Sequence, residues 1–448
     1  MIDDTTALAR CQDLVDMARK LGADEADAVA RANAAESVTM RLGKLEDVDR
    51  SESEDIGLRV FVGRRSASIN TSDYAPEGLK ALAQRAVEMA RHAPEDRYAG
   101  LADRDQLFDG TIPDLELNDP TAVGPAALRD RALAVEDAAR GVEGVTNSNG
   151  GSASASRAVA ALATSNGFVR SYAGSGFSLS ASVVAGEGAR MQTDHASRSA
   201  RFLEDLPSPQ SIGEEAGTRA VARLDPGSMP SGPYPVVFDP RVGIGIIGHL
   251  LGAMSGPAIA RKASFLLGKE DEQIFDRSIQ IIEEPLRPRG ARSRPFDGEG
   301  IACQNRKLVH DGRIFGWMTN VASAAQLDRG LTGHASRSGG GSPGVGASNV
   351  HIAKGSVTPA ALMADIEDGL YVTSLFGQGV NTVTGDYSRG ATGFRIRKGE
   401  RVGAVAEITI AGNLLDMFAA LVPADDLEMT RSINVPTLRI DGMTVAGA

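Results

Sequence analysis

The sequence predicts an α+β protein of two domains, in which helices pack against antiparallel sheets. Its 448 residues exceed what one ordinary hydrophobic core organises, so two or more domains are expected. Helical periodicity is mixed with short β-rich segments and hairpin turn signals, which is typical of α+β folds. Four prolines fall within residues 226–235, which predicts a linker between an N-terminal domain at 1–225 and a C-terminal domain at 236–448.

The first helix is expected over residues 6–21. Leu8, Cys11 and Leu14 recur there at helical spacing, and Gly22 provides a stop. Cys11 is therefore predicted to pack in the core, where it acts neither as a ligand nor as a nucleophile.

The rest of the first half alternates helices with strands. Turn signals at Asn166-Gly167 and at 186–188 make its serine-rich and alanine-rich part an antiparallel meander. His92 closes a helix beside Pro94, where a cation suits the helix dipole and needs no catalytic role. The expected elements are β-rich segments at 37–42, 57–62 and 66–71, helices at 76–91 and 125–140, the meander at 159–184 and a helix at 212–224.

The second half is expected to begin with a strand at 234–238 and the helix that carries His249. Asp311-Gly312 predicts a hairpin, and Thr358 caps a helix whose first residue is Pro359. The remaining expectations are a long loop at 336–348, strands at 370–376, 393–397 and 404–410, a short helix from Asn413 to 422 and a strand at 437–440.

The charge balance argues against a nucleic-acid partner. Lys and Arg total 47 against 58 for Asp and Glu, a formal net charge of −11, whereas duplex binding depends on clustered cations. A local basic stretch contains Arg287, Arg289, Arg292 and Arg294. It is interpreted as a solvated loop whose arginines reach acidic neighbours.

The sequence also predicts a cytoplasmic protein without a membrane span. Two cysteines, Cys11 and Cys303, cannot form a disulfide framework and fit a reducing compartment. The first residues are acidic where a signal peptide would be basic. The most apolar stretch, 242–254, is shorter than the about 20 residues that a membrane span needs.

The helix at His249 has the setting of a metal site without the ligands. A helical zinc site of the His-Glu-x-x-x-His type needs two imidazoles and a carboxylate base. Here His249 stands alone, followed by Leu250 and Leu251. A register one residue earlier puts Gly248 and Ala253 at the ligand positions and His249 at the position of the base. This pattern favours a subunit that positions something for a catalytic partner.

Two glycine motifs match known signatures only formally. Residues 243–248 fit a dinucleotide fingerprint, but Asp239 to Val242 separate the strand from the glycines. We expect these glycines instead to let a neighbouring element approach the helix closely. Residues 340–344 fit a nucleophile elbow, but Pro343 has no N–H to serve as an oxyanion donor. We interpret the second motif as a loop.

Two other possibilities stay open. A site could be assembled from distant residues, for example His249, Cys303 and His334. Residues 386–390, Asp-Tyr-Ser-Arg-Gly, cluster polar groups, either as a turn in which Arg389 satisfies carbonyls or as part of a cleft.

Several longer segments resemble the PmbA (TldE) branch of the TldD/PmbA family, and the likeness covers nearly the whole chain. They are Gly57-Leu-Arg-Val60, Gly248-His-Leu-Leu-Gly-Ala-Met-Ser-Gly256, Arg261-Lys-Ala-Ser-Phe-Leu-Leu267, Pro295-Phe-Asp-Gly-Glu-Gly300, Thr384-Gly-Asp-Tyr-Ser-Arg-Gly-Ala391 and Glu407-Ile-Thr-Ile-Ala-Gly-Asn-Leu-Leu415. The resemblance implies a two-domain α+β subunit of a heterodimer, whose TldD-like partner carries the zinc helix and a C-terminal cysteine ligand. The present tail at 430–438 has no cysteine.

The resemblance further implies a cytoplasmic peptidase complex that takes unfolded peptides, including modified peptide precursors and an antitoxin. The chain itself is then expected to be noncatalytic, with no cofactor or metal of its own, and to form a possible homodimer when alone. The alternatives are a metallopeptidase with atypical ligands and an interaction protein that modulates DNA gyrase. The residues expected to line the cleft or the partner interface are His249, Asp386, Tyr387, Arg389 and Asn413.

Overall fold

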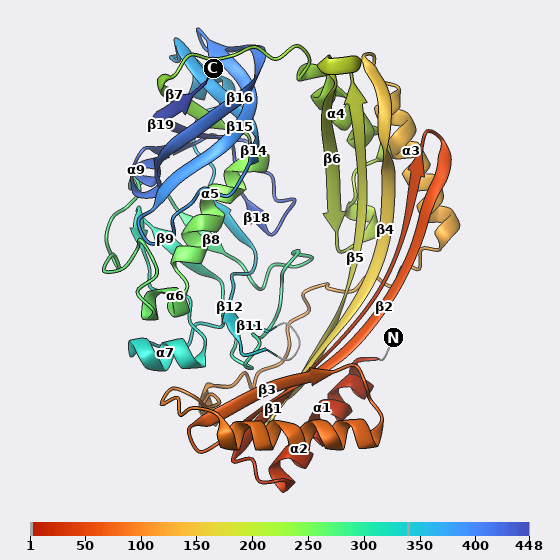
Figure 1. Ribbon diagram of the computed structural model, residues 1–448, viewed down its shortest axis with the longest axis vertical. Coiled ribbons are helices and arrows are strands. Elements are labelled where there is room, and N and C mark those ends of the chain that lie inside the picture. The colour runs from red at the N-terminus through yellow and green to blue at the C-terminus, as the bar shows by residue number, and fades with distance from the viewer. Residues whose placement is uncertain (1–2, 338–340, 448) are drawn as a thin grey trace.

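The computed structural model describes residues 3–337 and 341–447. A long, strongly curved sheet from the first half forms one side of the molecule, and the second half lies beside it as a more compact body (Figure 1). The fold is α+β with largely antiparallel sheets, as the sequence predicts.

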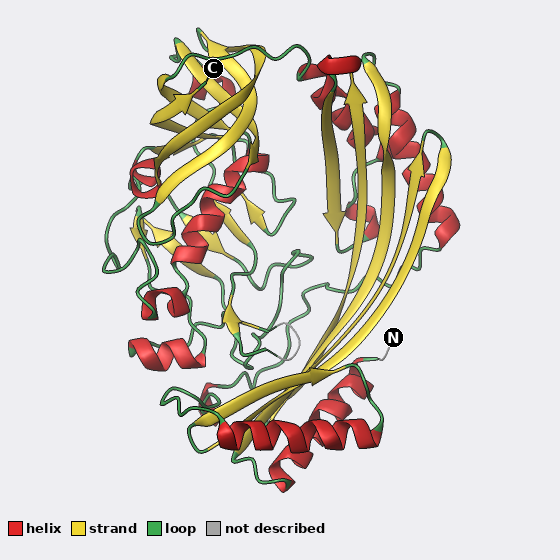
Figure 2. Ribbon diagram, viewed as in Figure 1, coloured by secondary structure: helices red, strands yellow, loops and turns green. Residues whose placement is uncertain are grey.

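The long sheet has six antiparallel strands in the order β3-β2-β1-β4-β5-β6. Figure 2 shows how far its central strands run along the molecule. Their bounds are β1 Glu25–Arg41, β2 Lys44–Val62, β3 Arg65–Thr71, β4 Val145–Thr164, β5 Val169–Ala185 and β6 Gln192–Ala200.

Four helices cover one face of this sheet. Even-numbered residues of β1 pack against all four helices. Ala28 packs with α1 and α2, and Val38 packs with α3 and α4. Because side chains alternate between the faces of a strand, all four helices lie on the same face and leave the concave face to the second half of the chain. The helices are α1 Asp4–Lys20, α2 Pro76–His92, α3 Pro125–Arg140 and α4 Pro209–Ala222, and 3-10 turns lie at Arg104–Gln106, Gly188–Arg190 and Leu203–Asp205.

The second half is built around a mixed sheet in the order β16-β15-β14-β7-β19-β17. The sheet closes on itself because β16 also pairs with β19, and β7 is parallel to β14. Its strands are β7 Gly232–Phe238, β14 Asp368–Phe376, β15 Asp386–Arg397, β16 Glu400–Asn413, β17 Leu421–Pro423 and β19 Leu438–Ala446.

Smaller elements complete the second half around the hydrophobic core that β7 and β14 share with helix α5. A second sheet runs β10-β9-β8-β13-β18, with β8 Ile281–Glu283, β9 Arg306–His310, β10 Arg313–Ile314, β13 Val350–Ile352 and β18 Ile433–Asn434. The helices are α5 Pro240–Ala253, α6 Gly256–Ala260, α7 Val321–Leu327, α8 Pro359–Met363 and α9 Leu414–Ala419.

The two halves also join through an apolar and an ionic contact at the concave face. Val29 and Leu162 of the long sheet pack in one cluster with Phe296 and Ile301. Beside them the buried Asp27 pairs with Arg59 of the same sheet and with Arg337 of the second half. This junction fixes the side of the long sheet that faces the second half.

The structure corrects three expectations about element boundaries. β1 and β2 are much longer than the segments expected at 37–42 and 57–62, and β15 begins at Asp386, so residues 386–390 are strand and form no turn. The expected loop at 336–348 contains a two-residue ladder of β11 Ala335–Ser336 with β12 Gly344–Val345. Residues 338–340, which include the first glycine of the elbow motif, lie outside the described residues.

The expectations for Cys11 and for two helix caps are confirmed. Cys11 is fully buried in the core of the first half. Thr358 and Asn413 accept hydrogen bonds from Ala361 and Leu415 as the caps of α8 and α9. Among the described residues, no helix is both long and apolar enough to cross a membrane.

Candidate functional site

Helix α5 follows β7 directly and places His249 against the closed sheet. Asp239 caps the helix by accepting a hydrogen bond from the N–H of Arg241 at 2.9 Å, and Pro240 is its first residue. The glycines at 243–248 therefore lie in the helix body, as expected for a chain without the dinucleotide fingerprint. The half-buried ring of His249 meets the ring of Tyr387 edge to face, with 6.1 Å between centroids.

Tyr387 and Arg389 come from β15 and share one face of that strand with each other. Tyr387 is 2% exposed, and burial raises its pKa to about 12. Burial lowers the pKa of His249 below its ordinary value, and the charge of Arg389 lowers it further. Arg389 also donates to the carbonyl of Phe376 at 3.4 Å, which is the carbonyl contact considered for it from the sequence.

Asp386 and Asn413 form a second group on the opposite face of the same strand. They are antiparallel partners of β15 and β16, and the Asn413 amide donates to Asp386 Oδ1 at 3.3 Å. Asn413 also donates to the carbonyl of Thr384, whose hydroxyl donates to Asp386 at 2.6 Å. The five sequence candidates are thus brought together as His249, Tyr387 and Arg389 on one side and a solvent-exposed Asp386–Asn413 pair on the other.

The close helix packing expected of the glycines in α5 is found at Gly243 and not at the later glycines. A Cβ atom on Gly245, Gly248 or Gly252 would have no neighbouring atom within 4 Å, and only at Gly243 would it come near a side chain, 3.0 Å from Val435 Cγ2. Gly248 and Gly252 instead line a cavity of about 290 Å³. The missing side chains leave this face of the helix open.

The residues around His249 do not fit a bound zinc ion. Gly248 and Ala253 have no ligating side-chain atoms, and the groups that contact or perturb His249 are a phenol ring and the cation Arg389. Within residues 3–337 and 341–447, no group of three or more His, Cys, Asp or Glu side chains is placed to hold a metal ion.

The distant combination of His249, Cys303 and His334 is not assembled either. The thiol of Cys303 donates to the carbonyl of Gly333 at 3.3 Å, and burial raises its pKa to about 12. His334 Nε2 lies 2.6 Å from Glu283 Oε2, and both side chains are only 2% exposed. These groups have structural partners of their own, away from the contacts of His249.

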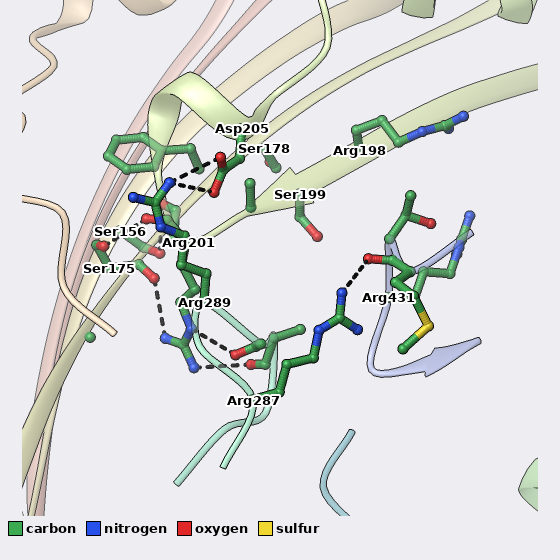
Figure 3. A pocket seen from close by; sticks show the side chains of 18 of the residues that line it. Ser156, Ser175, Ser178, Arg198, Ser199, Arg201, Asp205, Arg287, Arg289 and Arg431 are labelled. Atoms are coloured by element: carbon green, nitrogen blue, oxygen red, sulfur yellow. Dashed lines mark hydrogen bonds and ion pairs between the residues drawn. The ribbon is translucent and has the colours of Figure 1, made fainter. Parts of the chain in front are cut away.

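Sequence reasoning missed a second feature, a cleft between the concave face of the long sheet and the second half. It has a volume of about 620 Å³ and is lined by β4, β5 and β6 together with residues 287–291 and 429–431 (Figure 3). The alternation of serine with apolar residues along β4 and β5 was the signal that could have revealed its wall. Within the basic stretch that begins at Arg287, Arg289 reaches the acidic Glu116, Glu204 and Asp205, as expected from the sequence.

Comparisons with known proteins agree over the whole chain. Three family models match, described as PmbA/TldA metallopeptidase domain 1 at residues 26–90, central domain at 118–224 and C-terminal domain at 231–447. Metalloprotease PmbA of Escherichia coli O157:H7 is 35% identical over 414 residues, which cover 92% of this chain and 90% of the relative. A metalloprotease PmbA homolog of Haemophilus influenzae is also 35% identical, over 99% of both chains.

Solved structures show the same fold. A protein of Bacteroides thetaiotaomicron VPI-5482, named as a candidate modulator of DNA gyrase, superimposes with a TM-score of 0.91 at 27% identity over 100% of both chains. TldE of Thermococcus kodakarensis gives a TM-score of 0.85 at 20% identity and covers 98% of this chain and 100% of its own. The protein described here therefore belongs to the PmbA/TldD family, in its PmbA branch.

Proposed function

We propose that this chain is the noncatalytic subunit of a TldD/TldE-type zinc metallopeptidase heterodimer in the cytoplasm. The observation that carries the proposal is helix α5, on which a single histidine stands beside an open glycine face. A peptidase that uses zinc needs several ligands and a base around one open coordination position. The zinc would be held by a TldD-like partner, and this chain would contribute to the enclosure around the peptide.

The surroundings of His249 support a role without metal. A neutral imidazole could in principle bind zinc, and the lowered pKa of His249 favours the neutral form. The positive charge of Arg389 that helps to lower this pKa would, however, also repel a divalent cation at the same ring. His249 then serves to pack against Tyr387 and to shape the site.

The substrates of the complex are proposed to be unfolded peptides, such as modified peptide precursors or an antitoxin. The relatives from Escherichia coli O157:H7 and Haemophilus influenzae are named metalloproteases. An extended peptide can pair with a sheet edge through its main chain, which would allow many sequences to be accepted.

Metal analysis together with a peptidase assay tests this function. The chain is purified alone and with its TldD-like partner, metal is measured by plasma mass spectrometry, and cleavage of an unstructured peptide is followed. We expect near-zero zinc and no cleavage for the chain alone, and about one zinc per heterodimer with cleavage. Stoichiometric zinc and proteolysis by the isolated chain would mean that it is itself a metallopeptidase with atypical ligands.

A different role is suggested by the name of the Bacteroides structure, a candidate modulator of DNA gyrase. Direct binding of the isolated chain to gyrase, with no TldD-like subunit present, would favour that alternative. We expect no such binding under conditions in which the TldD-like partner binds.

A further inference from the structure

The concave face of the long sheet presents hydroxyl groups in rows that cross four strands. One row consists of Ser37, Ser154, Ser178 and Ser199, which are successive cross-strand partners on β1, β4, β5 and β6. The next row consists of Thr39, Ser152, Ser180 and Ser197. Hydroxyls donate and accept hydrogen bonds, so this wall can follow the polar main chain of a ligand.

The cleft of about 620 Å³ opens where the first row ends against the second half of the chain. Glycines in β5 hollow the wall at this point, because a Cβ atom on Gly174 would lie 2.6 Å from Arg201 Nη1. Arg201 thereby reaches across the cleft and donates to the carbonyls of Gly290 and Ala291 at 3.3 and 3.0 Å.

The ionised side chains that line this cleft are mostly cations, and Figure 3 shows them around it. They are Arg198, Arg201, Arg287, Arg289 and Arg431, against the single carboxylate of Asp205. The whole chain has a formal net charge of −11, so the local sign is opposite to that of the protein. Such a concave cationic surface attracts anions by focusing the field.

Three of these arginines have no carboxylate partner among the described residues. Arg201 and Arg287 donate to main-chain carbonyls alone, the latter to Met429 at 3.5 Å. Burial and the neighbouring cations Arg198 and Arg241 lower the pKa of Arg431, and the carboxylates of Asp239 and Glu215 oppose this shift more weakly. By contrast, Arg198 and Arg289 are paired with acidic side chains.

The cleft continues in both directions along the sheet. It shares Arg201 and Gly174 with a neighbouring cavity of about 390 Å³ that also contains Arg31 and Asn33. At its other end it shares Arg198 and Arg431 with a cavity of about 400 Å³ beside α5. That cavity is lined by both signs of charge, since it also holds Glu215, Asp239, Asp426 and Glu428, so the excess of cations is largest in the central cleft. A ligand that fits these joined cavities is long and narrow, as an extended peptide is.

We propose that this interdomain cleft binds an extended peptide segment rich in acidic side chains, through Arg287 and Arg431 and the hydroxyl rows. The inference rests on the proposed function in taking the ligand to be a peptide substrate. A single-stranded nucleic acid would also carry negative charge, but it needs aromatic rings on which its bases stack. The lining of the three cavities offers one ring each, which makes no row of stacking platforms: Phe177 in the central cleft is only 4% exposed, Tyr371 is 6% exposed, and the third ring is Tyr172.

The test measures binding of fluorescein-labelled peptides to the isolated chain by anisotropy. A decapeptide of alternating Glu and Ser is compared with one of alternating Gln and Ser, at low and at raised NaCl. We expect the Glu peptide to bind at least about tenfold more tightly, and salt to weaken this difference by screening. The double variant R287Q/R431Q should lose about tenfold in affinity for the Glu peptide.

Arg85→Gln, an exposed arginine on α2, is the matched control and should bind like the parent chain. Equal binding of the two peptides by the parent chain would overturn the proposal even if the double variant failed to fold. So would unchanged affinity in a folded double variant, or tighter binding of an oligodeoxynucleotide of equal charge. These results concern the isolated chain, so they are distinguishable from failure of the proposed subunit role, which metal analysis of the heterodimer decides.

Discussion

Asp297 is a buried carboxyl group whose ionisation opposes folding. Burial, and then the negative charge of Glu299, raise its pKa to about 6, although the N–H groups of Glu299, Ile301 and Ala335 donate to it. An unfolded aspartate ionises near pH 3.9. Between these two values the folded chain holds a proton that the unfolded chain has released, so the contribution of Asp297 to stability falls as pH rises from about 4 to about 6.

Asp297→Asn removes this titration and is expected to change the pH dependence of stability. Relative to the parent chain, the variant should gain up to about 3 kcal/mol in free energy of unfolding between pH 4 and pH 6, from two pKa units. The hydrogen bond that it loses from Ala335 costs the same at every pH, so the difference between the two pH values is the informative quantity. Urea unfolding at both pH values measures it, and parallel profiles would contradict the assigned pKa.

His249 is expected to remain neutral at physiological pH. Because Arg389 contributes to its lowered pKa, Arg389→Gln should raise the pKa of His249 toward its ordinary value. Nuclear magnetic resonance of histidine-labelled protein measures this shift, and a His249→Gln variant identifies the resonance. An unchanged pKa of His249 in the Arg389→Gln variant would show that Arg389 does not act on it.

At the scale of the element, α5 keeps glycines where alanine would fit. Gly248→Ala and Gly252→Ala place a methyl group in open space, so each should stabilise the protein by about 0.5–1 kcal/mol through helix propensity. Gly256→Ala in α6 is the control, because its Cβ would lie 2.8 Å from the carbonyl oxygen of Met318 and should destabilise. Urea midpoints test all three variants, and destabilisation by the α5 alanines would show that this face is packed.

Helices could be predicted from the sequence more completely than strands, for a physical reason. α3 has the expected bounds because its apolar residues recur at helical spacing and Pro125 and Gly141 punctuate its ends. β2 extends well beyond the segment expected at 57–62 because its residues 44–53 are exposed and mostly charged or polar, so no apolar alternation marks them. These residues of β2 form a strand because β2 pairs with β1 along its whole length, which is a tertiary effect.

At the scale of the whole molecule, the cleft could not be predicted because its residues are far apart in sequence. Serines near 154 and 178 meet arginines near 287 and 431 only after the second half docks on the concave face. The candidates of the α5 region were accessible to sequence reasoning because each lies in a longer motif. Asp386 lies on the face of β15 opposite to Tyr387 and Arg389 because the strand extends to Asp386. The sequence did not reveal that extension.

The ionic junction between the two halves leads to a prediction about the whole molecule. Asp27 is fully buried between Arg59 and Arg337, and Arg59 also pairs with Glu299 at 3.1 Å. Burial opposes its ionisation, but the charges of Arg337 and Arg59 outweigh burial and hold its pKa below the ordinary value. Asp27 is therefore ionised at neutral pH, where it neutralises cations from both halves.

Asp27→Asn should destabilise the protein by about 3–5 kcal/mol at neutral pH, because two buried guanidinium groups lose their shared carboxylate. Asp49→Asn, on the exposed part of β2, is the matched control and should change stability by no more than about 0.5 kcal/mol. Since the pKa of Asp27 is lowered on folding, its contribution is present above the unfolded pKa near 3.9 and is lost as pH falls through the folded value. Urea unfolding at neutral and acidic pH measures both effects. Equal stability of the two variants at neutral pH would show that the shared carboxylate of Asp27 contributes little to the junction of the two halves.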